Sequence, residues 1–173
     1  MSETLDIVGQ ILEEHKQFSN DFQSLSKVTS DVEAASKLDS KKTKDFFVPK
    51  SLDDHGSGVL QWKEMLEGID RGLRAHFDRE ETALVGAFKR DGTPELAAAL
   101  EELMKEHSSL NQHVAKLLKD ADDIASGGAK IEVWEGSGWG MKTNIDRLRA
   151  EIEEHAEKER VLLGTMKAHM ENS

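Results

Sequence analysis

Residues 62–84, WKEMLEGIDRGLRAHFDREETAL, contain a row of mostly apolar side chains that recurs at steps of three and four residues. This spacing places the row on one face of an α-helix, the face that a helical protein buries. Two members of the row are polar and stand one turn apart. The complete row is Trp62, Leu66, Ile69, Leu73, His76, Glu80 and Leu84. The stretch therefore predicts an amphipathic helix with a histidine and a carboxylate on its core face.

Three further stretches show the same period, and each carries a histidine on its apolar face. These histidines are His15, His107 and His155, and Glu159 follows His155 by one helical turn. The four patterns together predict helices over about residues 4–36, 58–89, 94–125 and 141–170. Every predicted helix therefore presents at least one potential metal ligand to the core.

The connections between these stretches indicate how the helices pack. Gly92 suits a left-handed helix end, and Thr93-Pro94 is typical of a helix start. The turn between the second and third helices is therefore short, and the two helices run antiparallel. Residues 38–58 and 126–140 have the composition of longer connectors. We expect one domain, residues 1–173, with an all-α fold: an up-down-up-down antiparallel four-helix bundle.

Composition excludes several kinds of partner and site. The formal net charge of −11 makes nucleic acid or an anionic membrane surface an unfavourable partner. The absence of cysteine means that any metal must be bound by nitrogen and oxygen ligands. Residues 1–10 lack the basic and apolar regions of a signal peptide, and no apolar run approaches the ~20 residues of a membrane span. We therefore expect a cytoplasmic protein, and the sequence indicates no oligomeric state.

The polar core residues have the spacing of a metal site. His76 and Glu80 are four residues apart, as are His155 and Glu159, so each pair lies on one helix face. At about 1.5 Å of rise per residue, the predicted boundaries place His15 within about one turn of His76 in depth. Two such pairs suit a dinuclear site, with each carboxylate able to bridge both ions. In the alternative interpretation, the histidines are only hydrogen-bonded core residues of a structural bundle.

These residues resemble the hemerythrin, or HHE cation-binding, family. The resemblance is carried by His15 in Glu-Glu-His, residues 76–81 (His-Phe-Asp-Arg-Glu-Glu), His107 in Glu-His-Ser-Ser-Leu, and the pair His155 and Glu159. It implies a hemerythrin-like fold with a non-haem di-iron centre, in which an oxo or hydroxo group joins the two iron ions. It further implies that Glu80 and Glu159 bridge the ions. His15 and His76 would bind one iron, and His107 and His155 the other.

One position departs from the family pattern. Oxygen-carrying hemerythrins have a fifth histidine one turn before the position of His107, where this chain has Leu103. Leucine cannot bind a metal, so one iron would keep an additional open position. Of the remaining histidines, we expect surface roles for His55 and His113, and we expect His169 to lie about 15 Å from Glu159 along the helix, too far for the same centre.

Glu81 is expected to point away from the ligand line, either as an outer partner of the site or in solvent. The function that the resemblance implies is sensing, binding or handling of oxygen, nitric oxide, peroxide or iron, in a binding or sensing protein rather than an enzyme. The alternative is a di-iron oxidase or a peroxide-consuming, catalase-like enzyme. Zinc or manganese are possible substitutes for iron, because histidine and carboxylate ligands suit all three metals.

Overall fold

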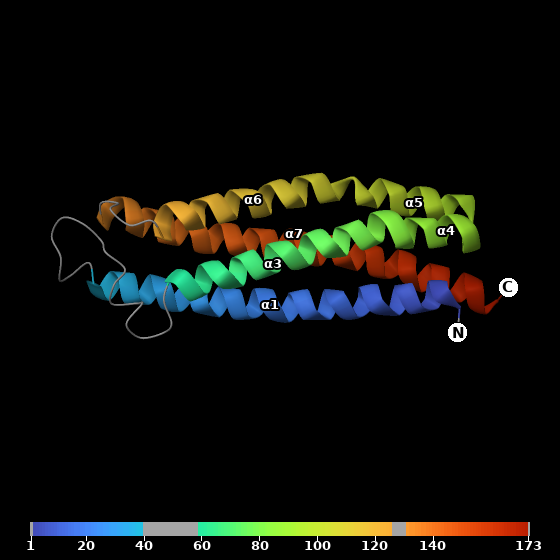
Figure 1. Ribbon diagram of the computed structural model, residues 1–173, viewed down its shortest axis with the longest axis horizontal. Coiled ribbons are helices and arrows are strands. Elements are labelled where there is room, and N and C mark those ends of the chain that lie inside the picture. Colours follow the sequence, from blue (N-terminus) through green and yellow to red (C-terminus); the bar gives the residue numbers. More distant parts are fainter. Residues whose placement is uncertain (1, 40–58, 126–130, 173) are drawn as a thin grey trace.

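The computed structural model describes residues 2–39, 59–125 and 131–172. Four long helical rods lie side by side and alternate in direction, with both termini at the same end (Figure 1). The first rod is α1 (Glu3–Asp39) and the last is α7 (Ile131–Glu171). The second consists of α3 (Val59–Arg79), the π-helix η1 (Glu80–Leu84) and α4 (Val85–Asp91), and the third of α5 (Pro94–Met104) and α6 (Glu106–Ala125). The predicted all-α, up-down-up-down bundle is confirmed.

The second rod contains a one-residue shift at the level of the polar core residues. From Trp62 to Glu80 the predicted core face follows alternating steps of three and four, with Phe77 buried beside it, and the next step of three would reach position 83. The next buried residues are instead Leu84, Ala87 and Phe88. A π-helical turn accommodates one additional residue, and η1 spans this segment. The π turn therefore keeps Glu80 and the apolar residues after it on the same core-facing side.

The turn between the second and third rods differs from the prediction in one detail. Gly92 has φ −98° and ψ −175°, outside the expected left-handed region. A Cβ atom at Gly92 would lie 2.6 Å from the Phe88 carbonyl oxygen, so close backbone approach requires glycine there. The predicted helix start is confirmed, since the Leu96 N–H donates to Thr93 Oγ1 at 3.3 Å. The third rod is interrupted at Lys105, where the backbone makes a single turn before α6 begins.

The prediction of a connector over residues 126–140 was wrong for its second part, because α7 begins at Ile131 rather than near residue 141. The glycine-rich segment 136–140 is helical. Each glycine costs only about 1 kcal/mol relative to alanine, and an established helix gains one hydrogen bond for each residue added. The remaining connector residues, 126–130, and residues 40–58, which include His55, lie outside the described residues.

Two apolar clusters fill the core on either side of a polar layer. The larger cluster contains residues of segments 18–25, 62–77, 110–121 and 141–152, among them Phe22, Trp62 and Leu148. The smaller contains residues of segments 8–11, 84–88, 100–104 and 163–166. The predicted metal ligands fall between these segments in every rod, apart from His76, which lies at the end of segment 62–77 beside Phe77. The clusters therefore hold the four rods in register above and below the polar layer.

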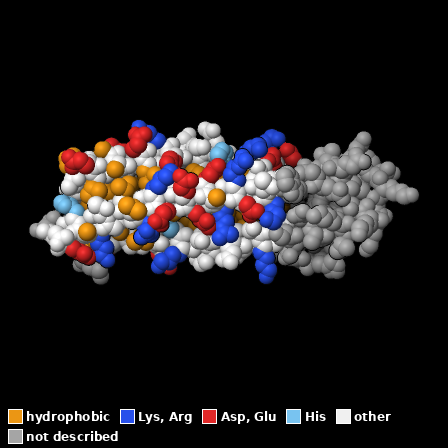
Figure 2. Space-filling view, turned by 180° about the vertical axis from the view of Figure 1, so that it is seen from behind, with side chains coloured by type: hydrophobic (Ala, Val, Ile, Leu, Met, Phe, Trp, Pro, Cys, Tyr) orange, Lys and Arg blue, Asp and Glu red, His pale blue; other side chains and the backbone are white. Residues whose placement is uncertain are grey.

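The outer surface in the described residues carries mixed acidic and basic side chains, with apolar groups gathered toward one end of the face in Figure 2. Many of the charged residues form ion pairs with a residue of the same helix, such as Arg74 with Asp70 and Lys142 with Asp146. None of the described helices is long and apolar enough to cross a membrane.

Candidate metal centre

The structure brings the six predicted ligands together in the polar layer, with at least one from each rod. The two carboxylates, Glu80 and Glu159, are completely buried. His76, His107 and His155 are each 2% exposed. His15 is partly buried, and 13% of its side chain remains accessible. Such burial of two carboxylates side by side requires compensating positive charge.

The first group of potential ligand atoms surrounds His15 and His76. The His76 Nε2 atom lies 2.6 Å from Glu80 Oε1. The His15 Nε2 atom lies 3.2 Å from Glu159 Oε2 and 3.6 Å from Glu80 Oε1. One ligand atom from each of these four residues lies within 4.8 Å of the others. The group therefore offers two imidazole nitrogens and two carboxylates to one ion.

The second group surrounds His107 and His155 and shares Glu80 with the first. The second oxygen of Glu80, Oε2, lies 3.1 Å from His107 Nε2. The Nε2 atoms of His107 and His155 are themselves 3.1 Å apart. Glu80 is thus the residue common to both groups, while Glu159 falls within the first group alone among the described residues. The bridging role that the resemblance implies for Glu159 stays a prediction.

Several polar atoms of this layer are buried without a hydrogen bond from any described residue. They are both oxygens of Glu80, both oxygens of Glu159, and the Nε2 atom of His15. A buried carboxylate without hydrogen bonds costs several kcal/mol, and these atoms belong to the clustered ligand candidates. Divalent cations bound in the two ligand groups would offset the charge of these buried carboxylates, so the donor set fits a metal.

The pKa values show how protons compete for the same atoms. Burial raises the pKa of Glu159 to about 7. Burial lowers the pKa of His15, but the close carboxylates of Glu159 and Glu80 outweigh this effect and raise the pKa to about 9. Burial also opposes ionisation of Glu80, yet its contacts with His107, His15 and His76 hold its pKa well below the usual range. Metal binding at this centre is therefore coupled to proton release.

Comparison with models of known protein families assigns this chain to a family. The model of the hemerythrin HHE cation-binding domain matches residues 6–166. The chain belongs to this family. Searches of curated proteins and of solved structures gave no match. The predicted hemerythrin-like family is thereby confirmed, and cation binding is the property that its members share by description. A single domain over residues 1–173 stays a prediction.

Three further carboxylates contact the histidines of this hemerythrin-family site from outside. The Nδ1 atom of His76 lies 2.6 Å from Glu14 Oε2, that of His107 lies 2.8 Å from Glu81 Oε1, and that of His155 lies 3.0 Å from Glu106 Oε2. The sequence indicated an outer role for Glu81 as one of two alternatives. It missed Glu14 and Glu106, although each directly precedes a core histidine in the chain.

The position of the missing fifth histidine is occupied by apolar packing. Leu103 is 7% exposed and belongs to the smaller core cluster with Leu100 and Met104. Of the other histidines, His113 lies at the surface, as predicted, and its Nδ1 atom lies 2.6 Å from Glu151 Oε2. His169 lies partly buried near the end of α7 and belongs to neither ligand group in the described residues.

Proposed function

We propose that this protein holds two iron ions in the polar layer and uses them to bind or sense a small molecule: oxygen, nitric oxide, peroxide or iron itself. In this proposal His15 and His76 bind the first ion, and His107 and His155 the second. Glu80 and Glu159 would supply carboxylate oxygens to both. Iron accepts imidazole and carboxylate ligands, and zinc or manganese could substitute for it. The proposal places the protein in the cytoplasm.

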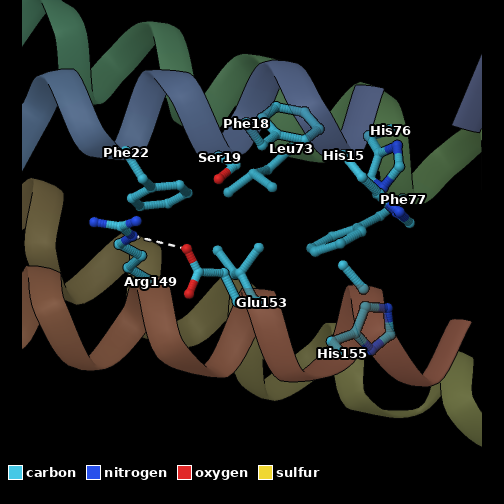
Figure 3. A pocket seen from close by; sticks show the side chains of 12 residues that line it. His15, Phe18, Ser19, Phe22, Leu73, His76, Phe77, Arg149, Glu153 and His155 are labelled. Carbon is cyan, nitrogen blue, oxygen red and sulfur yellow. Dashed lines mark hydrogen bonds and ion pairs between the residues drawn. The ribbon is translucent and has the colours of Figure 1, made fainter. Parts of the chain in front are cut away.

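A small cavity beside the first ligand group indicates which small molecules could bind there. It has a volume of about 30 Å³ and is bordered by His15, His76 and His155. Figure 3 shows these histidines and Phe77 at one end of the cavity, and the ion pair between Arg149 and Glu153 at the other. A water-sized molecule needs about 10–15 Å³ on this measure, so the space suits a molecule of two or three atoms.

The remaining lining favours an apolar ligand. Phe18, Phe22, Leu73 and Ile152 give the cavity a largely apolar lining, and Figure 3 shows Phe18 and Leu73 between the histidines and the ion pair. An apolar wall offers no hydrogen bonds, and a polar molecule that enters it loses those that it makes with water. Dioxygen and nitric oxide lose little on entry, whereas hydrogen peroxide loses more. The cavity therefore supports binding or sensing of a diatomic gas.

The second candidate, a peroxide-consuming or oxygen-reducing enzyme, is favoured by a different observation. Leu103 leaves the second ligand group one histidine short of the oxygen carriers, so an additional position would be open for a reactant. Bound iron would supply the redox chemistry of such a reaction. Peroxide turnover that persists unchanged in His107→Ala protein would argue against this candidate.

Iron loading under anaerobic conditions tests the proposed function. We expect about two iron ions per chain, and optical bands that change on addition of oxygen or nitric oxide. His76→Ala should reduce the bound iron, whereas His113→Ala, which removes a surface histidine, should not. Less than about one iron per wild-type chain would contradict the di-iron proposal.

A further inference from the structure

Each of three buried histidines has its two ring nitrogens in different surroundings. The Nε2 atoms of His76 and His107 face Glu80, and that of His155 faces the Nε2 atom of His107. Their Nδ1 atoms face outward to other carboxylates. An ionised carboxylate can only accept, so the Nδ1–H group must donate to it. This tautomer leaves the Nε2 lone pair directed into the polar layer, where a metal ligand is needed.

The outer carboxylates link the rods in the order in which they follow one another in the chain. Glu14 of α1 contacts His76 of α3, and Glu81 of η1 contacts His107 of α6. Glu106 of α6 contacts His155 of α7. Every one of these carboxylates is also the direct sequence neighbour of a ligand candidate: His15, Glu80 or His107. In each pair of adjacent residues, one residue is therefore a ligand candidate, and the other contacts the histidine of the next rod.

Two of the three carboxylates are themselves held by cations. Arg79 lies 2.8 Å from the second oxygen of Glu14, and Lys158 lies 2.9 Å from that of Glu106. Glu81 contacts no Lys or Arg among the described residues and is 51% exposed at its side chain, against 19% for Glu14 and 40% for Glu106. Water competes more readily for an exposed carboxylate, so Glu14 is the most constrained of the three.

We propose that Glu14, Glu81 and Glu106 are positioning residues of the metal centre, which fix the tautomer and ring orientation of His76, His107 and His155. This inference rests on the proposed function, because it assumes that these histidines bind metal. Outer partners of this kind typically change metal affinity by 10–100-fold. The loss of metal affinity on substitution should be largest for the least exposed carboxylate, Glu14, smaller for Glu106, and smallest for Glu81.

The first test compares iron(II) affinities of single alanine variants by anaerobic competition with a chelating dye. Glu14→Ala should weaken binding by about 100-fold, and Glu106→Ala and Glu81→Ala by about 10-fold or more. The matched control is Glu151→Ala, which removes the same kind of contact to the Nδ1 atom of the surface residue His113. The control should bind iron as the wild type does. Affinities of all three variants equal to the control would overturn the proposal.

A second measurement separates orientation from general damage to the fold. Nuclear magnetic resonance of the zinc-loaded protein should show hydrogen-bonded Nδ1–H protons of His76, His107 and His155, and each alanine variant should lose the signal of its own partner. Glu14→Gln should keep part of the affinity, since the amide oxygen still accepts from Nδ1–H. Circular dichroism of each metal-free variant controls for folding. If a variant unfolds, its glutamine counterpart serves for the comparison.

The outcomes distinguish this inference from the proposed function. If the wild-type protein binds neither iron nor zinc, both the proposed function and the positioning role are overturned. Wild-type protein that binds about two metal ions, with unchanged affinity and unchanged Nδ1–H signals in the variants, would overturn the positioning role alone.

Discussion

The two ligand groups of the centre use the same residue types but differ in their surroundings. The first group, around His15 and His76, includes both buried carboxylates and borders the small cavity. The second group, around His107 and His155, shares only Glu80 with it, and of its two histidines His155 lines the cavity while His107 does not. The ring of Phe77 stacks on His107, with ring centroids 3.9 Å apart and an angle of 15° between the planes.

This difference indicates a division of roles within one site. The first group offers two imidazoles and two carboxylates and has space for a small molecule beside it. The second is packed against Phe77 and is one histidine short at Leu103. A ligand in the cavity would therefore contact both histidines of the first group and, of the second group, only His155. Variants that act on one group, or on both, can test this division.

The largest effect is expected from Glu80→Gln, which acts on the residue common to both groups. The amide removes the negative charge that both ions would share, so we expect loss of both metals and a decrease in affinity above the roughly 100-fold limit typical of outer partners. Elemental analysis after anaerobic iron loading measures this. Glu151→Gln provides the surface control. Retention of about two iron ions by Glu80→Gln would show that Glu80 is not shared.

Metal removal from the wild type should lower thermal stability. A ligand present at about 100 times its dissociation constant stabilises the native state by about 2.7 kcal/mol, or roughly 5–10 °C in Tm for a chain of this size. Calorimetry before and after treatment with a chelator measures the change. An unchanged Tm would support the alternative of a purely structural bundle with hydrogen-bonded core histidines.

The metal-free protein should lose stability as the pH rises from 7 to 9. The pKa of His15 is raised to about 9 in the folded protein, from an ordinary value of 6.5. A group with a raised pKa stabilises the fold fully below its unfolded pKa, and this contribution disappears as the pH passes the folded value. We expect a loss of about 2 kcal/mol, measured by urea unfolding. His15→Gln should remove most of this pH dependence, and equal slopes in both proteins would contradict the assignment.

Leu103→His should act on the second group alone. A histidine one turn before His107 offers the additional imidazole that oxygen carriers have, so iron should bind more tightly there and leave less room for an added anion such as azide. The buried polar ring should destabilise the metal-free protein by about 1–3 kcal/mol. Azide titration followed by optical spectra measures the first effect. Unchanged azide affinity would mean that position 103 does not face the second ion.

The smallest effect is expected from Ala156→Leu, which fills the cavity beside the first group. The larger side chain should slow nitric oxide binding by about tenfold, equivalent to a barrier higher by about 1.4 kcal/mol, without changing the iron content. Stopped-flow mixing measures the rate. Ala98→Leu adds the same side chain at an exposed position of α5 and should leave the rate unchanged. Equal rates in both variants would show that the ligand takes another path.

The sequence by itself determined the class of fold and the six candidate ligands. Apolar steps of three and four residues specify helices and their buried faces, and a histidine such as His107 on that face is visible without coordinates. The sequence also predicted the surface position of His113. It misplaced the start of α7, because local glycine content competes with helix propagation from the packed part of the rod.

Only the tertiary structure decided how the ligands are shared and supported. The contact of Glu14 with His76 joins residues 62 positions apart, and no local pattern specifies which helices become neighbours. The cavity depends in the same way on residues of different rods, Phe18 of α1, Leu73 of α3 and Ile152 of α7. Helical periodicity is a local property and can be read along the chain, whereas shared oxygens, outer hydrogen bonds and cavities arise between rods and require their packing.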